Sequence, residues 1–261
     1  MVRGKLQPIR RLVRKAYREI APDSVSHDST VLPAKHLRFC GAEFKDNGYF
    51  LASAKAEAER LIEQNHLSQR SRILDLGCGV GRLPIGILGR GLEIGSYLGI
   101  DVDERSIRWC KKYIQSKHPQ FQFQHTNARN ALYNPNGAEL DTHLRLPFED
   151  GSADIIYMYS VFSHMLTDDI RLYTREFKRV LAQGGSVFLT AFVEDNVPDV
   201  VENPAGYKMA WNGALHCVRY NLAFLRRLFT QAGFQFANFV HGLETDGQSA
   251  IYLVHSPIEI V

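Results

Sequence analysis

The chain has 261 residues, of which 45% are hydrophobic and 23% are charged, an ordinary composition for a globular protein with a sizeable core. No apolar run reaches the roughly 18 residues that a transmembrane helix needs. The N-terminus lacks an apolar stretch followed by small residues, which disfavours a secretory signal. The cysteines are widely spaced and include no CxxC pair, so we expect free thiols and a cytoplasmic location. They are Cys40, Cys78, Cys110 and Cys217.

The net charge of +3 is unevenly distributed along the chain. Residues 1–20 hold seven basic side chains against one acid, which leaves 24 basic and 27 acidic groups, a net charge of −3, in the rest. A mildly acidic body disfavours an extended nucleic-acid interface, so any affinity for polyanions is expected in the N-terminal arm alone.

Residues 1–68 are predicted to form an N-terminal helical extension. Apolar residues of 9–20 fall on one helical face with basic residues opposite, which predicts an amphipathic helix. Its apolar face could serve as a lid or a dimer contact, and the whole helix could instead anchor the protein at a membrane surface or on RNA. Turn-forming residues dominate 22–48, and an alanine-rich stretch predicts a helix over 52–64.

Residues 69–261 are predicted to form the main domain, in which strands and helices alternate. Strands are expected at 72–76, 97–101, 121–125, 154–160 and 186–192, followed by a closing pair at 234–240 and 250–254. Helices are expected at 81–88, 104–116, 167–181 (with Thr167 as its cap) and 221–232. This order predicts an α/β fold with a mainly parallel seven-stranded sheet flanked by helices. Ligands bind such sheets at the carboxyl ends of the strands.

The first strand runs into a glycine-rich turn. Asp75 lies in the strand end, and Gly77, Gly79 and Gly81 follow at alternate positions before Arg82. Alternating glycines let the backbone turn sharply and approach a ligand closely. In a G-x-G-x-x-G dinucleotide fingerprint counted from Gly77, Arg82 would occupy the position of the third glycine. This departure disfavours the interpretation that the protein is a dehydrogenase.

A second acid follows the next strand. Asp101 ends Gly99-Ile100-Asp101, 24 residues after Gly77, where a carboxylate can accept both hydroxyls of a ribose. The alternative is a helix-start acid, a role that Asp103 could also fill. After the third strand, the chain carries no acid at this point but Asn127, followed by Ala128.

These motifs, with the segments 146–154 and 159–165, resemble the class I S-adenosylmethionine (SAM)-dependent methyltransferases over roughly residues 70–255. The resemblance implies a Rossmann-like fold, SAM as the cofactor and S-adenosylhomocysteine as the product. The residues that it implies for cofactor binding are Asp75, Gly77, Cys78, Gly79, Gly81, Arg82, Asp101, Val102, Asn127, Ala128, Ser160 and Val161.

The acceptor side of the site is less defined by the sequence. His164 is the candidate general base, because an imidazole titrates near neutrality, although it could equally pack or hydrogen-bond beside the adenine. The segment 128–146, which links the third and fourth predicted strands, could form a wall of the substrate site or only a surface loop. Candidate substrate-binding residues are Tyr49, Tyr159, Trp211 and His216. Arg38 and Arg82 could pair with the SAM carboxylate or form structural ion pairs.

The sequence therefore predicts an enzyme that methylates a small molecule, on a hydroxyl oxygen, in secondary or glycan metabolism. Alternatives are an N- or C-methyltransferase, an enzyme acting on RNA or another macromolecule held by the basic arm, a non-catalytic SAM-binding protein, and a dehydrogenase. Base N-methylation is disfavoured, because residues 160–163 lack an Asn-Pro-Pro-aromatic motif. The histidine spacing suggests no metal site. We expect a monomer or a homodimer that does not bind nucleic acid.

Overall fold

The computed structural model describes residues 21–39, 41–211 and 213–257. The predicted amphipathic helix at 9–20 and Cys40 lie outside these residues. No helix among the described residues is both long enough and apolar enough to cross a membrane.

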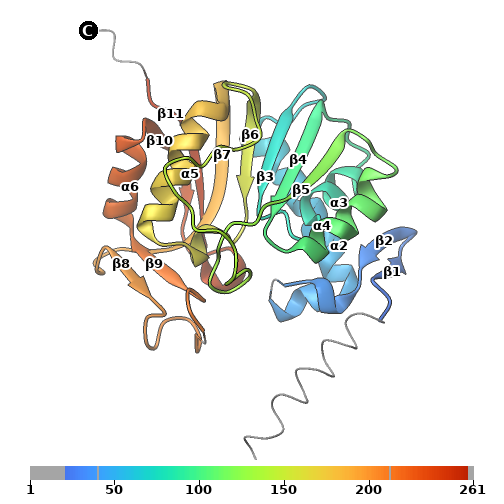
Figure 1. Cartoon of the computed structure of the whole chain (residues 1–261), viewed down its shortest axis with the longest axis horizontal. Coiled ribbons are helices and arrows are strands. Elements are labelled where there is room, and N and C mark those ends of the chain that lie inside the picture. The colour runs from blue at the N-terminus through green and yellow to red at the C-terminus, as the bar shows by residue number, and fades with distance from the viewer. Residues whose placement is uncertain (1–20, 40, 212, 258–261) are drawn as a thin grey trace, which may run out of the picture.

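In the described part of the chain, nine strands form the central sheet (Figure 1). Seven of them follow the order β10-β11-β7-β6-β3-β4-β5, and β9 extends the sheet beside the end of β7, with β8 paired to it. The strands from β5 to β7 are mutually parallel, while β11 is antiparallel to both β7 and β10. The predicted mainly parallel sheet is thus confirmed, with two short strands added. The bounds are β3 (Arg72–Leu76), β4 (Ser96–Asp101), β5 (Phe121–His125), β6 (Ala153–Met158), β7 (Leu181–Glu194), β8 (Val200–Glu202), β9 (Val218–Asn221), β10 (Phe234–Val240) and β11 (Ser249–His255).

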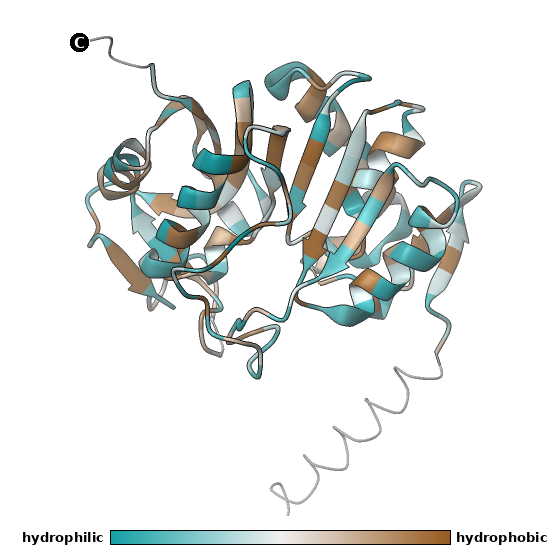
Figure 2. Ribbon diagram, turned by 45° about the horizontal axis from the view of Figure 1, so that its top comes forward, coloured by the Kyte–Doolittle hydropathy of each residue, from teal (hydrophilic) through white to brown (hydrophobic). Residues whose placement is uncertain are grey.

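Helices cover both faces of this sheet. The cluster on one face joins side chains of the sheet to α2, α3 and α4, and the cluster on the other joins them to α5 and α6. In β6, Ile155 and Tyr157 belong to the first cluster and Ile156 and Met158 to the second, because successive side chains of a strand point to opposite faces. Figure 2 shows the hydrophobic residues concentrated in these central strands. The helices are α2 (Asn47–Asn65), α3 (Arg82–Gly89), α4 (Glu104–Cys110, continued by a π-helical turn, Lys111–Gln115), α5 (Thr167–Val180) and α6 (Leu222–Gln231).

The N-terminal segment before α2 holds a hairpin that the turn-rich composition did not predict. β1 (Ser24–His27) and β2 (Thr30–Pro33) pair antiparallel around Asp28 and Ser29, which both have positive φ, as in a type I′ hairpin turn. Two short 3₁₀ helices, η1 (Lys35–Leu37) and η2 (Ala42–Lys45), lead into α2. Side chains of this segment and of α2 belong to the same core as the sheet, so the segment packs against the main domain.

Most predicted elements are present, and the differences concern their ends. α2 begins at Asn47, before the alanine-rich stretch, because Asp46 caps it by accepting a hydrogen bond from the Tyr49 N–H at 2.8 Å. The predicted cap Thr167 is wrong: Thr167 is the first residue of α5, and Leu166 precedes it without a side-chain cap. β7 starts at Leu181, directly where α5 ends, rather than after the glycine pair.

Candidate functional site

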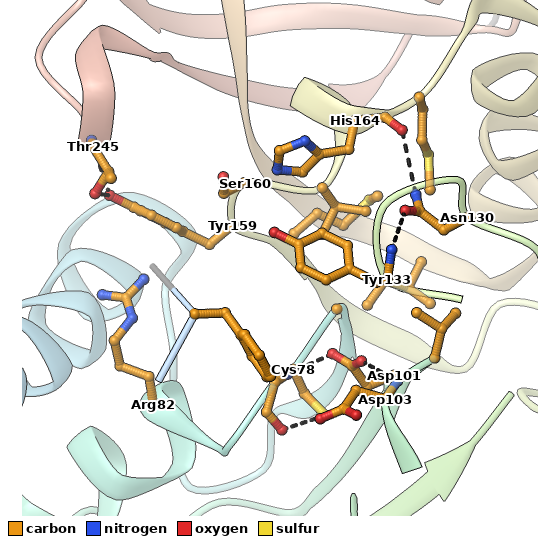
Figure 3. Close-up of a pocket in the computed structure, with 18 of the residues that line it drawn as sticks. Cys78, Arg82, Asp101, Asp103, Asn130, Tyr133, Tyr159, Ser160, His164 and Thr245 are labelled. Carbon is orange, nitrogen blue, oxygen red and sulfur yellow. Dashed lines mark hydrogen bonds between the residues drawn. The ribbon is translucent and has the colours of Figure 1, made fainter. Parts of the chain in front are cut away.

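A pocket of about 590 Å³ opens where the parallel strands end. Its walls come from the glycine-rich turn after β3, the ends of β4 and β6, and three segments that lie outside the sheet. The first comprises residues 38–39 and 41–44, the second lies within 126–140, and the third contributes Met209, Trp211 and His216. Figure 3 shows Cys78 and Asp101 on one side of the pocket and Ser160 and His164 on the opposite side. The volume lies within the range of small-molecule sites, about 300–1,000 Å³.

Two glycines of the turn after β3 have different tasks. Gly77 has a φ of 76°, and a Cβ there would lie 2.3 Å from Val161 Cγ2, so the turn packs tightly against the segment after β6. Gly79 has a φ of 50°, and a Cβ there would meet no atom within 4 Å. The backbone at Gly79 therefore lines the pocket with open space before it, which suits close approach of a ligand.

Asp101 lines the pocket and holds the turn through hydrogen bonds to its carboxylate. Oδ2 accepts the Gly79 N–H at 2.7 Å, and Oδ1 accepts the Asp103 N–H at 2.7 Å (Figure 3). Burial raises the pKa of this carboxyl to about 6, against these backbone hydrogen bonds, which lower it. Each oxygen keeps a further lone pair, so the carboxylate can accept two neighbouring hydroxyls.

Asp75 lies deeper, at the end of β3, and is only 2% exposed. The Tyr97 hydroxyl donates to its Oδ2 at 2.5 Å, whereas its Oδ1 is buried without a hydrogen-bond partner in the structure. Burial raises the pKa of Asp75 to about 7. Because Asp75 lines the pocket, a ligand cation beside it would supply the missing partner.

Asp75→Asn is expected to stabilise the ligand-free protein at pH 8 and to lose this advantage towards pH 4. The folded-state pKa is raised from 3.8 to about 7, so the wild type loses stability as the pH rises between these values, whereas asparagine does not ionise. We expect a melting temperature on the order of 5 °C above wild type at pH 8. Thermal unfolding at pH 4, 6 and 8 measures this, with Asp199→Asn as the exposed control. A destabilised Asp75→Asn at pH 8 would contradict the expectation.

His164 lies in the short helix η4 (Phe162–His164) after β6 and is 8% exposed. Its Nδ1 is 3.0 Å from the Leu215 carbonyl oxygen, which can only accept, so Nδ1 carries the proton and the neutral ring accepts at Nε2. Burial lowers the pKa of His164 below 6.5. The Tyr133 ring packs edge-on against the imidazole at 5.5 Å.

The two arginines considered for the cofactor carboxylate have different surroundings. Arg38 is 1% exposed and donates to the carbonyl oxygens of Pro33, Phe44 and Asp46, so it fastens the segment before α2. Arg82 lines the pocket, with its Nη1 3.5 Å from Glu57 Oε1. Its guanidinium also lies 4.2 Å over the ring of Tyr159.

Most residues predicted from the sequence line this single pocket. They are Asp75, Gly77, Cys78, Gly79, Arg82, Asp101, Val102, Ala128, Tyr159, Ser160, Val161, His164, Trp211 and His216.

Three predicted residues do not line the pocket. A Cβ at Gly81 would lie 2.8 Å from Ile114 Cδ1, so this glycine permits close packing on the helix after β4. Asn127 is exposed and accepts a hydrogen bond from the Asn134 amide at 3.1 Å, while its neighbour Ala128 does reach the pocket. Tyr49 is 46% exposed and packs edge-on against the ring of Phe44.

Several lining residues were not predicted. Asn130 and Tyr133 come from the link 128–146, whose length and turn signal did point to a wall. Phe44 comes from the segment before α2, and Gln248 precedes β11; no local pattern marks either of them. Among the described residues there is no group of three or more His, Cys, Asp or Glu that could hold a metal ion.

Comparisons with known proteins agree on the fold. Residues 74–189 match a family model described as a methyltransferase domain. An uncharacterized protein from Haemophilus influenzae is 25% identical over 132 residues, which cover 50% of this chain. The match covers 46% of that protein, so the chain spans about half the length of this curated relative.

Solved structures share the arrangement at low sequence identity. A chain of the complex between the Haloferax volcanii Trm112 methyltransferase activator and "the putative methyltransferase" is 18% identical, with a TM-score of 0.56 over 82% of this chain and 92% of that one. A SAM-dependent methyltransferase from Methanosarcina mazei is 20% identical, with a TM-score of 0.53 over 76% and 98%. The [4+2]-cyclase SpnF is 17% identical, with a TM-score of 0.57 over 79% and 82%. With the family match over residues 74–189, these likenesses show that the chain has the Rossmann-like fold of the SAM-dependent methyltransferases.

Proposed function

We propose that the protein transfers the methyl group of SAM to a hydroxyl oxygen of a small-molecule acceptor. The proposal rests on one pocket that brings two groups of residues together. The glycine-rich turn and Asp101 lie on one side of it, and His164 lies on the opposite wall. A pocket of about 590 Å³ has room for a nucleoside-containing ligand and a small second molecule beside it.

The cofactor side of the pocket fits SAM by the chemistry of its residues. Asp101 would accept the two ribose hydroxyls, and the open backbone at Gly79 would lie against the ligand. Asp75 has a buried, unpartnered oxygen that suits the ammonium group of the cofactor's amino-acid part. When bound, SAM supplies a methyl carbon that is already activated by its positively charged sulfur.

On the acceptor side, His164 is suited to take a proton from a hydroxyl. Because its Nδ1–H is directed to the Leu215 carbonyl, Nε2 is the ring nitrogen that accepts. Burial lowers its pKa, which keeps the imidazole neutral and ready to accept at pH 7. Trp211 and His216 line the same pocket, and their rings pack edge-on at 5.3 Å, which would give the acceptor a firm wall.

Cofactor binding tests the first part of the proposal. Isothermal titration calorimetry should detect binding of S-adenosylhomocysteine and no binding of NADH at the same protein concentration. Binding of NADH alone would overturn the proposal in favour of a dehydrogenase. Radiolabelled methyl transfer to a panel of alcohols, amines and RNA then identifies the acceptor class, and labelling of RNA alone would exclude a small-molecule acceptor.

His164→Gln is expected to lower kcat by about 10²–10⁴-fold with little change in S-adenosylhomocysteine affinity, because glutamine cannot take a proton. In the wild type, activity should fall on the acidic side with an apparent pKa below 6.5, since burial lowers the pKa of His164. Rate measurements from pH 5 to 8 on an accepted alcohol test this, and His143→Gln, at an exposed histidine, is the control. An undiminished rate in His164→Gln would exclude the base role.

A further inference from the structure

Ser160 has a backbone conformation that is unfavourable for residues other than glycine. It follows β6 after Tyr159, and its φ of 58° lies in the left-handed region. A residue with a Cβ is held there only when its surroundings fix it, and such positions concentrate at functional sites. Ser160 and Val161 both line the pocket, so this turn belongs to the site.

Two buried side chains hold Ser160 from both ends. Its backbone N–H donates to Thr190 Oγ1 at 2.7 Å, and the Thr190 hydroxyl donates to Gln248 Oε1 at 2.8 Å. Gln248 Nε2 donates to Ser160 Oγ at 2.8 Å, which closes a ring of hydrogen bonds. Ser160 Oγ also lies 3.2 Å from Ser163 Oγ. Thr190 is fully buried and Gln248 is 2% exposed, so breaking the ring would leave buried polar groups unpaired.

The turn at Ser160 controls the placement of two parts of the site. Val161 lies so close to Gly77 that a Cβ on the glycine would be 2.3 Å from Val161 Cγ2. The His164 N–H donates to the Val161 carbonyl at 3.0 Å, which makes His164 part of the same short helix. A change of φ at Ser160 would therefore move Val161 against the glycine-rich turn and displace the imidazole.

We infer that Gln248 is a positioning residue, which acts with Thr190 to hold Ser160 in the left-handed conformation that the cofactor pocket needs. Gln248 lies 88 residues after Ser160, between η5 (Thr245–Gly247) and β11. The neighbouring Thr245 hydroxyl is hydrogen-bonded at 2.8 Å to that of Tyr159, so the same loop fastens two successive residues of the pocket. The inference rests on the proposed function, because the site that Gln248 positions is the SAM pocket.

A matched pair of threonine variants tests the hydrogen-bond ring. Thr190→Val removes the hydroxyl while keeping the side-chain shape, and we expect S-adenosylhomocysteine binding to weaken about tenfold. Thr174→Val makes the same change at a fully buried position of α5, where the hydroxyl donates to the Ile170 carbonyl. Its affinity should stay within about twofold of wild type, because Thr174 does not line the pocket and its hydroxyl bonds to the backbone of its own helix. Equal affinities for the two variants would overturn the inference.

A rescue experiment separates positioning from simple packing. Gln248→Leu should also weaken binding about tenfold, whereas adding Ser160→Gly should restore most of the affinity, because glycine adopts positive φ without a Cβ clash. Ser160→Gly alone completes the cycle, and circular dichroism checks folding. Failure of glycine to rescue Gln248→Leu would contradict the inference; should Gln248→Leu not fold, the threonine pair decides. A wild type that does not bind S-adenosylhomocysteine would overturn the proposed function and this inference together.

Discussion

Asp101→Ala is expected to bind S-adenosylhomocysteine at least about 100-fold more weakly than the wild type. Hydrogen bonds to a charged acceptor contribute about 1.5–3 kcal/mol each, and this variant loses two of them to the ribose. The change also removes the acceptor for the Gly79 N–H, which loosens the turn that the ligand contacts. Titration calorimetry measures the affinity directly.

Asp101→Asn and a pH series show whether the charge of Asp101 is responsible. Burial raises the pKa of Asp101 to about 6 in the free protein, and ribose hydroxyls that donate to the carboxylate would lower it in the complex. Wild-type affinity should therefore fall below pH 6, by up to about tenfold per pH unit. Asp101→Asn should have weak affinity and a shallower fall, because Asp75, with a pKa of about 7, still titrates on the cofactor side of the pocket. Wild-type affinity that is equal at pH 5 and pH 8 would rule out the ribose contact.

The sequence was most informative where the constraint is local. β3 has the predicted bounds of Arg72–Leu76, because an apolar run buried on both faces ends at a glycine that must take positive φ. Asp101 could be placed in the pocket for a similar reason: the acid ends the neighbouring parallel strand, and carboxyl ends of adjacent parallel strands meet at one edge.

The sequence was less informative where distant segments meet. Asn127 follows β5, where a polar side chain was expected to face the cofactor. The segment that follows instead folds back through a β-bridge between Ala128 and Ala138. The Asn134 side-chain amide donates a hydrogen bond to the Asn127 side chain, outside the pocket. The ring around Ser160 is equally non-local, since it joins residues after β6, within β7 and before β11. No periodicity or turn signal in the sequence encodes such pairings. The residues next to one partner do not determine where the other partner lies in the fold.

Gly86→Ala is expected to destabilise the protein by about 2 kcal/mol or more, through the contact between α2 and α3. A Cβ at Gly86 would lie 1.8 Å from the carbonyl oxygen of Ala54 and 2.4 Å from its carbon. Both are backbone atoms, so the clash is relieved only if the helices move apart. The gain in helix propensity, about 1 kcal/mol, does not offset this cost.

Gly89→Ala is the matched control in the same helix. A Cβ at Gly89 would lie 3.2 Å from Lys55 Cε, the mobile end of a long side chain, so the propensity gain should dominate and leave stability unchanged or slightly higher. Urea denaturation of both variants measures the contrast. Displacing α2 would also move Glu57, which accepts from the Tyr157 hydroxyl at 2.9 Å and pairs with Arg82 at the pocket wall. Gly86→Ala should therefore weaken S-adenosylhomocysteine binding as well, whereas equal stability of the two variants would contradict the close approach of the helices.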